Sequence, residues 1–202
     1  MRKNNRDRIL DTARRLLPRH GYHGVSLRAI ASRAKLTTGA VYFHFKDKRD
    51  IYRTICFEAI DALVESFRKG ILSRKTPGQK LISTFDSYID FYYNHRDRYN
   101  ILMEYKALYN PEGTIDDHEI AERMCAMTDL MEETICEGTR DGIFREVNPR
   151  MLGLLLAAVA EGMLQLKKLG MFDHLKISDK EFRKFMADTM GRGILKNDRN
   201  AG

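Results

Sequence analysis

Residues 37–44 form a short segment with several polar side chains that can contact nucleic-acid bases. Four of its residues have hydrogen-bonding side chains: Thr37, Thr38, Tyr42 and His44. Gly39 has no side chain and would let the backbone approach a partner closely. Threonine can hydrogen-bond a base or pack on a thymine methyl group, and a tyrosine hydroxyl suits a phosphate oxygen. Lys46 and Lys48 follow and add positive charge. The chemistry of this segment is therefore recognition of a polyanion.

Residues on either side of this segment extend the same chemistry. Arg28 and Lys35 are candidates for phosphate or base contacts. Ser26 and Asp47 are each placed to cap a helix, and the free N–H groups at a helix N-terminus can bind phosphate. A metal-binding role for His44 is not favoured, because no histidine or cysteine lies three or four residues from it.

The positive charge of the chain is concentrated in its first quarter. The formal net charge of the 202 residues is +7. Residues 1–50 contain 13 Lys and Arg against 4 Asp and Glu, whereas residues 51–202 contain 22 against 24. A basic block with regular apolar positions is typical of a nucleic-acid-binding domain. The alternative, a solvated basic tail, requires lower hydrophobicity than residues 9–45 have.

The first element that must position these side chains is an amphipathic helix over residues 6–17. Its apolar residues recur at helical spacing, at Ile9, Leu10, Ala13, Leu16 and Leu17. Pro18 predicts a kink, because proline lacks the helical N–H, and Gly21 predicts the helix end. Either Phe43 or Phe45 is expected to be buried in the core of this block.

Two short helices joined by a tight turn are predicted next. Ser26 is expected to cap a helix that runs to about Arg33, and Thr37 is expected to cap a second helix over residues 38–44. This spacing indicates a helix-turn-helix. Lys35 occupies the turn position where glycine with a positive φ is usual, at a cost of about 1 kcal/mol.

The remainder of the chain is also expected to be helical, so the fold class is all-α. Asp47 predicts a third capped helix, and residues 75–78 (Lys-Thr-Pro-Gly) break the chain after it. Later helical segments are predicted over residues 81–93, 97–109, 115–140, 151–169 and 179–195. We assign residues 1–50 to a three-helix DNA-binding domain and residues 51–202 to a helical ligand-binding and dimerisation domain.

The basic block resembles the N-terminal domain of the TetR/AcrR family of transcriptional regulators. The residues that carry the resemblance are 8–13, 21–22, 26–31, 38–45 and Lys48. The resemblance implies that Ser26, Thr38, Tyr42, His44 and Lys48 contact DNA. Farther along, residues 141–144 (Asp-Gly-Ile-Phe) resemble the turn before the penultimate helix of the family.

The predicted helix over residues 151–169 is apolar on nearly every side and therefore needs cover on every side. The simplest cover is the same helix and the last helix of a second copy, and the family resemblance implies the same homodimer. Its expected interface residues are Leu152, Leu155, Val159, Gly162, Leu166, Phe182, Phe185 and Met186. The alternative is a monomeric core.

The middle helices contain aromatic and methionine side chains that suit the walls of a small-molecule pocket. The candidate ligand-binding residues are Phe85, Tyr88, Tyr92, Met103, Met127, Met131 and Met163. Plain core packing is the alternative interpretation of each residue, and the family resemblance is what favours a pocket.

These observations predict a ligand-responsive, DNA-binding transcriptional regulator. We expect a repressor that a small apolar or aromatic inducer releases from a palindromic operator. A homodimer would hold two recognition helices about 34–36 Å apart, one turn of DNA, and the ligand would favour a different spacing. The alternative function is a chromosome-organising DNA-binding protein without a role in transcription.

The sequence does not support other classes of function. It contains no glycine-rich phosphate loop after a strand and no metal-spaced cluster, so we expect neither an enzyme nor a cofactor or metal. The chain has three cysteines, Cys56, Cys125 and Cys136, and this odd number fits a reducing cytoplasm better than a set of disulfides. Residues 116–119 are interpreted as a solvated helix start. The longest apolar run, residues 151–160, is shorter than the roughly 20 residues of a membrane span.

Overall fold

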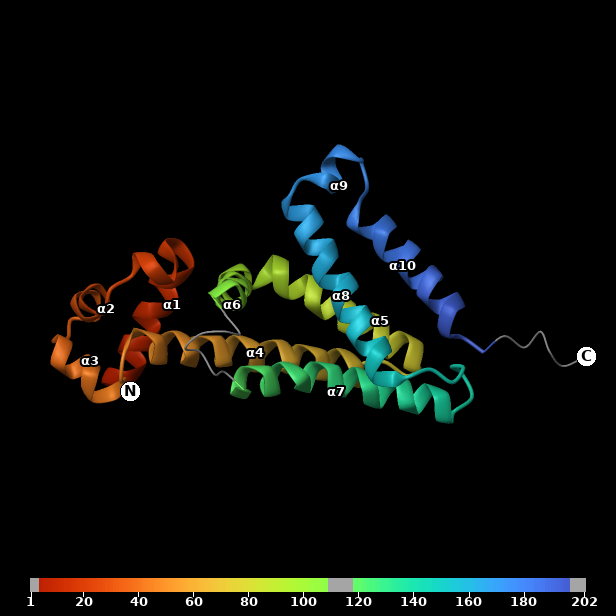
Figure 1. Cartoon of the computed structure of the whole chain (residues 1–202), viewed down its shortest axis with the longest axis horizontal. Coiled ribbons are helices and arrows are strands. Elements are labelled where there is room, and N and C mark those ends of the chain that lie inside the picture. Colours follow the sequence, from red (N-terminus) through yellow and green to blue (C-terminus); the bar gives the residue numbers. More distant parts are fainter. Residues whose placement is uncertain (1–3, 109–117, 197–202) are drawn as a thin grey trace, which may run out of the picture. The chain divides into compact units, whose positions relative to one another are not determined.

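The computed structural model describes residues 4–108 and 118–196, and this part of the chain is helical apart from its connections and one isolated bridge (Figure 1). The helices are α1 (Asn5–Gly24), α2 (Leu27–Arg33), α3 (Thr38–His44), α4 (Lys48–Leu72), α5 (Pro77–Asn94), α6 (Arg96–Leu108), α7 (His118–Arg140), α8 (Pro149–Lys168), α9 (Met171–His174) and α10 (Asp179–Ile194). The all-α prediction is confirmed. The short α9 was not predicted, and residues 109 and 115–117 of two predicted helices lie outside the described residues.

The chain divides into two compact units. The first comprises Met1–Ala62 and Phe91–Arg123, and the second comprises Leu63–Asp90 and Met124–Gly202. Helix α4 contributes to both units. The functional division at residue 50 that the sequence suggested stays a prediction, and the first unit contains α6 in addition to the N-terminal helices.

Helix α1 breaks at Gly21 and not at Pro18, which corrects the predicted kink. Pro18 lies inside the helix, whereas Gly21 has non-helical angles of φ 69° and ψ 172°. Because proline has no backbone N–H, Pro18 removes one hydrogen bond near the helix end, and the missing bond affects a single turn. The positive φ requires glycine at this position, and a Cβ atom at Gly21 would lie 2.8 Å from the Glu104 Oε1 atom, so the Glu104 side chain would also have to shift.

The predicted caps position α2 and α3. The side chain of Ser26 accepts the N–H of Ala29, and the side chain of Thr37 accepts the N–H of Ala40, each at 3.1 Å. Lys35 has a φ of 53°, as the sequence predicted for the turn. Arg8 of α1 supports this turn, because its Nη2 atom donates to the Ala34 carbonyl at 2.7 Å. The strained turn is therefore held by a charged donor that lies far away in sequence.

The helix-turn-helix is built around its own apolar core. The buried residues of this core are Ile9, Leu10, Ala13, Leu16, Leu17, Val25, Ile30, Ala31, Ala34, Val41 and Phe45. Phe45 is 3% exposed and Phe43 is 85% exposed, so Phe45 is the buried member of the pair. Since Val41 and Phe45 are four residues apart, they share the inward side and leave Phe43 outside.

In the second unit, the turn at residues 141–144 is fixed by a close contact between α7 and Phe144. A Cβ atom at Gly138 would lie 2.3 Å from the Phe144 ring, so glycine is required there. Phe144 also forms an antiparallel bridge with Leu195 after α10. Lys80 of α5 donates to both carboxylate oxygens of Glu137 on α7, at 2.6 and 2.7 Å. These contacts join α5, α7 and the end of α10.

Candidate nucleic-acid interface

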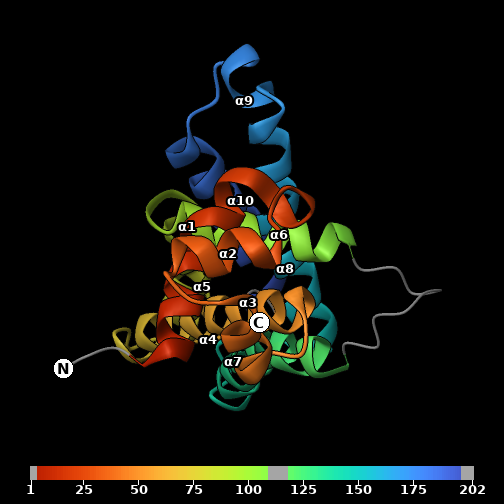
Figure 2. The same cartoon turned by 90° about the vertical axis from the view of Figure 1, so that its left-hand side faces the viewer.

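Helix α3 presents its polar and aromatic side chains on the side away from the buried core. Val41 is fully buried, whereas its neighbours Tyr42 and Phe43 are 57% and 85% exposed. Gly39 is exposed, and a Cβ atom there would meet only the Thr37 hydroxyl, at 3.9 Å. The outer side of α3 is therefore open to a partner. Helices α1, α2 and α3 face the viewer in Figure 2.

The structure brings most of the predicted DNA-contacting residues together on α2, on α3 and in the turns beside them. The exposed members are Ser26, Arg28, Lys35, Thr37, Gly39, Tyr42 and Lys46. Thr38 and His44 are half-buried. The hydroxyls of Ser26 and Thr37 are occupied as acceptors of helix caps, yet each can still donate its proton outward. Their placement as contact residues stays a prediction.

The N-terminus of α4 is a poor phosphate site, contrary to the expectation for Asp47. The Asp47 side chain accepts the N–H of Asp50 at 2.8 Å, and the Asp50 side chain accepts the N–H of Lys46 at 3.1 Å. Two carboxylates thus occupy the donors that a phosphate would use, and they would repel it.

Lys48 is engaged within the protein, which changes its expected role. Its Nζ atom donates to the Tyr22 carbonyl at 2.7 Å and lies 4.1 Å from the centroid of the Tyr22 ring. The side chain is half-buried. Lys48 therefore ties the start of α4 to the end of α1, and we omit it from the exposed contact set.

A second set of contacts, which we call the Glu104 network, joins α6 to the end of α1 and the start of α4. The Glu104 carboxylate accepts the N–H of Tyr22 at 2.7 Å and the hydroxyl of Tyr52 at 2.8 Å. The Ile101 carbonyl lies 3.1 Å from the same Tyr52 hydroxyl, whose single proton it shares with Glu104. The rings of Tyr22 and Tyr52 meet edge to face, with centroids 5.1 Å apart. Burial, followed by the hydrogen bond to Glu104, raises the pKa of Tyr52.

Three residues of this region, Arg8, Phe43 and Glu104, were not identified from the sequence. Arg8 and Glu104 make contacts across 26 and 82 residues of sequence, which no local pattern reveals. The outward position of Phe43 follows from its spacing relative to Val41, so helical periodicity contained that signal.

Comparisons with known proteins place this geometry in a family. The model for "Bacterial regulatory proteins, tetR family" matches residues 9–55, the helix-turn-helix and the start of α4. The transcriptional regulator AcrR of Shigella flexneri is 45% identical over 53 residues, 26% of this chain and 25% of AcrR. The chain belongs to the TetR family.

Two longer similarities extend beyond the helix-turn-helix. The transcriptional activator FasR of Mycolicibacterium smegmatis is 24% identical over 159 residues, which is 79% of this chain and 70% of FasR. A TetR-family regulatory protein from Rhodococcus RHA1 has the same fold, with a TM-score of 0.72 at 19% identity, over 97% of this chain and 100% of that one. This TetR-family chain is thus a DNA-binding transcriptional regulator and not an enzyme.

The predicted ligand-binding residues of this TetR-family regulator are mostly buried. Phe85, Tyr88, Met127, Met131 and Met163 are buried in the second unit. Tyr92, which is buried, and Met103, which is half-buried, belong to the first unit. These positions fit core packing as well as pocket walls, so ligand binding stays a prediction.

Tyr88, one of these buried residues, makes a hydrogen bond to α8 in the second unit. The Tyr88 hydroxyl hydrogen-bonds to the carboxylate of Glu161 on α8, and Gln165 donates to the same carboxylate at 2.6 Å. Glu161 was not among the predicted residues. Its half-buried carboxylate is a hydrogen-bond acceptor beside the buried Tyr88 side chain.

The predicted interface residues of α8 and α10 divide into two groups. Leu155, Leu166 and Phe185 are exposed, and Val159, Gly162 and Phe182 are half-buried. Leu152 and Met186 are 8% and 7% exposed, because they pack inside the chain itself, and this corrects their expected position.

Several exposed apolar residues in this part of the TetR-family chain were not among the predicted interface residues. We define the apolar face as the exposed residues Met151, Leu154, Leu155, Leu166, Leu169, Met171, Leu175, Ile177 and Phe185. Helix α8 is also the one described helix that is long and apolar enough to cross a membrane, and 28% of its apolar stretch is buried. Large exposed apolar surfaces are typical of interaction sites.

No group of three or more metal-ligating side chains is found among the described residues. Asp116 and Asp117 of the predicted acidic helix start lie outside them, and Glu119 forms ion pairs with Arg53 and Arg123. Cys56 is buried, whereas Cys125 and Cys136 are exposed free thiols. Glu119, the acidic residue of this segment that the structure describes, is therefore used in ion pairs.

Proposed function

We propose that this TetR-family regulator is a repressor that binds a palindromic operator as a homodimer and is released by a small apolar or aromatic inducer. The observation that carries the proposal is the combination, in one chain, of an open α3 surface and an uncovered apolar face. The first supplies contacts to DNA, and the second supplies a means of pairing two such surfaces. We propose the cytoplasm as the location.

The DNA contacts in this proposal come from the exposed side of α2, α3 and their turns. The proposed contact residues are Ser26, Arg28, Lys35, Thr37, Thr38, Gly39, Tyr42, His44 and Lys46. Side chains near the start of a recognition helix contact base edges in the major groove, and the basic side chains around it contact phosphates. The net charge of +9 in residues 1–50 supports this assignment, because binding to a polyanion releases counterions.

A second copy of the chain is the proposed cover for the apolar face. Met151 and Leu169 at the two ends of α8 are 70% and 76% exposed, so the face extends along the helix. A bilayer is a poorer cover, because Glu161 would place a carboxylate in the middle of the span. Exposed Ala157 and Ala158 between the large side chains let two helices approach closely.

The inducer is proposed to bind among the aromatic and methionine side chains of residues 51–202. Tyrosine and methionine adapt to apolar ligands, and the hydrogen-bonded Tyr88–Glu161 pair could orient a polar end of such a ligand. Release from DNA would require the ligand to favour the non-binding state by about 1–3 kcal/mol. Native mass spectrometry of freshly purified protein tests this part by detecting a bound molecule.

Two measurements test this proposal together. A reporter gene under the control of the DNA upstream of the regulator's own gene tests whether the chain represses or activates, and sedimentation of the purified protein tests whether it is a dimer. We expect the wild-type chain to lower expression and to sediment at twice its mass of 23.5 kDa. Phe185→Glu places a charge on the apolar face, so we expect a monomer that does not repress. Lys180→Glu, on an exposed polar position of the same helix, is the matched control.

The two outcomes that oppose the proposal are distinct. Increased expression with wild-type protein would make the chain an activator, as the name of the relative FasR states for that protein. A dimeric Phe185→Glu variant that represses normally would remove the apolar face from the mechanism.

A further inference from the structure

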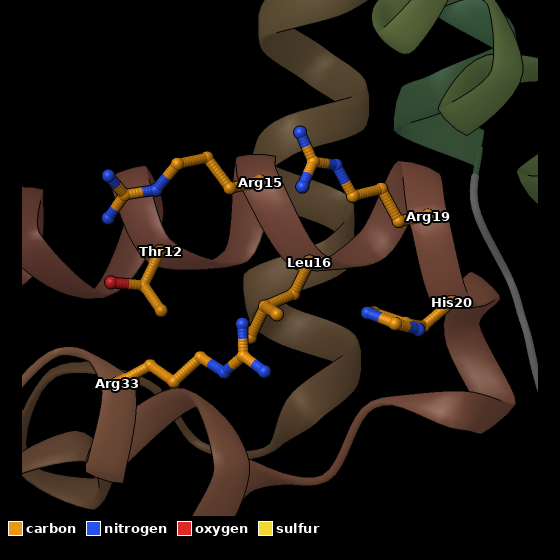
Figure 3. A pocket seen from close by; sticks show the side chains of 6 residues that line it. All are labelled: Thr12, Arg15, Leu16, Arg19, His20 and Arg33. Atoms are coloured by element: carbon orange, nitrogen blue, oxygen red, sulfur yellow. The ribbon is translucent and has the colours of Figure 1, made fainter.

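Three of the six residues that line a cavity between α1 and α2 are arginines. The volume of this cavity is about 280 Å³, and its lining residues are Thr12, Arg15, Leu16, Arg19, His20 and Arg33. Figure 3 shows the side chains of Arg33 and His20 extending from opposite ends toward the space beside Leu16, while Arg15 and Arg19 emerge from α1 alongside. We call this cavity the cationic cleft.

The positive charges of the cationic cleft are not neutralised by the protein. Within the described residues, Arg15, Arg19 and Arg33 make no ion pair or hydrogen bond, and all three side chains are exposed. Other arginines of α1 are used differently. Arg14 pairs with Glu58 and Asp11 at 2.7 and 2.6 Å, and Arg8 donates to the Ala34 carbonyl.

Helix ends do not account for this concentration of charge. Arg33 lies in the last turn of α2, where the partial negative charge of the helix end favours a cation. That partial charge is about half an elementary charge, so it cannot balance three guanidinium groups. Like charges around one cavity raise its potential and favour an anion in it.

We propose that the cationic cleft binds a phosphate group. Guanidinium groups are planar, permanently charged and bind phosphate oxygens in pairs, and three of them belong to residues that line this cavity. The cavity is several times larger than the roughly 30 Å³ share of one water molecule in the liquid, so a phosphate group fits with its surrounding solvent. The Thr12 side chain already donates to the Arg8 carbonyl, so the guanidinium groups provide the binding.

This phosphate could belong to the DNA backbone beside the groove that α3 enters, or to a free phosphorylated molecule. Both sources offer the same chemistry to the cleft, and they differ in whether DNA must be present. The site itself does not depend on the proposed repressor function, because phosphate binding is measurable on the DNA-free chain.

The first arm of the test is calorimetric titration of the DNA-free, full-length protein with inorganic pyrophosphate. We expect saturable binding by the wild-type chain and at least a tenfold loss of affinity in the variant Arg15→Gln, Arg19→Gln. The matched control is Arg74→Gln, Lys75→Gln, which also removes two positive charges, from exposed positions between α4 and α5. The control should bind as wild type, and equal thermal unfolding midpoints confirm that all three proteins are folded.

The second arm measures the affinity for duplex DNA at several salt concentrations. If the phosphate belongs to DNA, the cleft variant shows a smaller slope of log affinity against log salt than the control, by about 0.9 for each DNA phosphate that it no longer neutralises. If the phosphate belongs to a free molecule, the two slopes agree and pyrophosphate binding distinguishes the variants. The proposal is overturned if the cleft variant matches the control in both arms, whether or not the chain represses transcription.

Discussion

Alanine at both Thr38 and Tyr42 is expected to weaken operator binding about 100-fold, because each good base or phosphate contact is worth roughly 1–3 kcal/mol. Both side chains belong to α3, and Tyr42 is 57% exposed. Neither caps the helix, since Thr37 performs that role. The free energy of unfolding should therefore change little, because Tyr42 is exposed, Thr38 is only half-buried and the cap is retained.

Fluorescence anisotropy with a labelled operator duplex measures this effect directly. Tyr93→Ala is the matched control, because Tyr93 is a 46% exposed tyrosine on α5, away from the recognition helix. We expect the control to bind as the wild-type chain does. If the double variant bound as tightly as this control, α3 would not be the element that contacts DNA.

Replacing Glu104 by alanine is expected to lower the free energy of unfolding by about 2–4 kcal/mol, because it leaves buried and half-buried donors without a charged acceptor. The Tyr22 N–H would lose its hydrogen bond of 2.7 Å. Tyr52, which is 1% exposed, would lose its bond of 2.8 Å and keep only the Ile101 carbonyl. The cavity left by the carboxylate would add to the loss.

Urea denaturation followed by circular dichroism tests the role of Glu104. Glu133→Ala removes a carboxylate from an exposed position of α7 and serves as the control, with an expected change within about 0.5 kcal/mol. An unchanged midpoint for Glu104→Ala would show that the Glu104 network contributes nothing to stability.

We also expect the variant to weaken DNA binding, since the network joins α6 to the end of α1 and the start of α4 in one unit.

Local signals in the sequence were sufficient for the helix-turn-helix. Ser26, Thr37 and Asp47 were predicted as caps, and each accepts the expected backbone N–H. Lys35 was predicted to adopt a positive φ and does so. These features depend on a few neighbouring residues, so propensity and spacing determine them without knowledge of the rest of the chain.

Features that depend on distant contacts were not predictable in the same way. Lys48 is adjacent to the basic turn in sequence, yet its ammonium is held by Tyr22 of α1. Leu152 and Met186 have the same apolar character as exposed Leu155 and Phe185, and only packing separates the two pairs. The cationic cleft likewise requires that Arg33 of α2 and Arg15 and Arg19 of α1 line one cavity.

Chemical protection of the operator by the wild-type chain tests most directly whether α3 enters the major groove of a duplex. Dimethyl sulfate methylates guanine N7 in the major groove and adenine N3 in the minor groove, and the two edges are chemically distinct. We predict protection of guanine N7 in two half-sites about one helical turn apart. Protection confined to adenine N3, with guanine N7 fully reactive in the bound complex, would contradict this mode of binding.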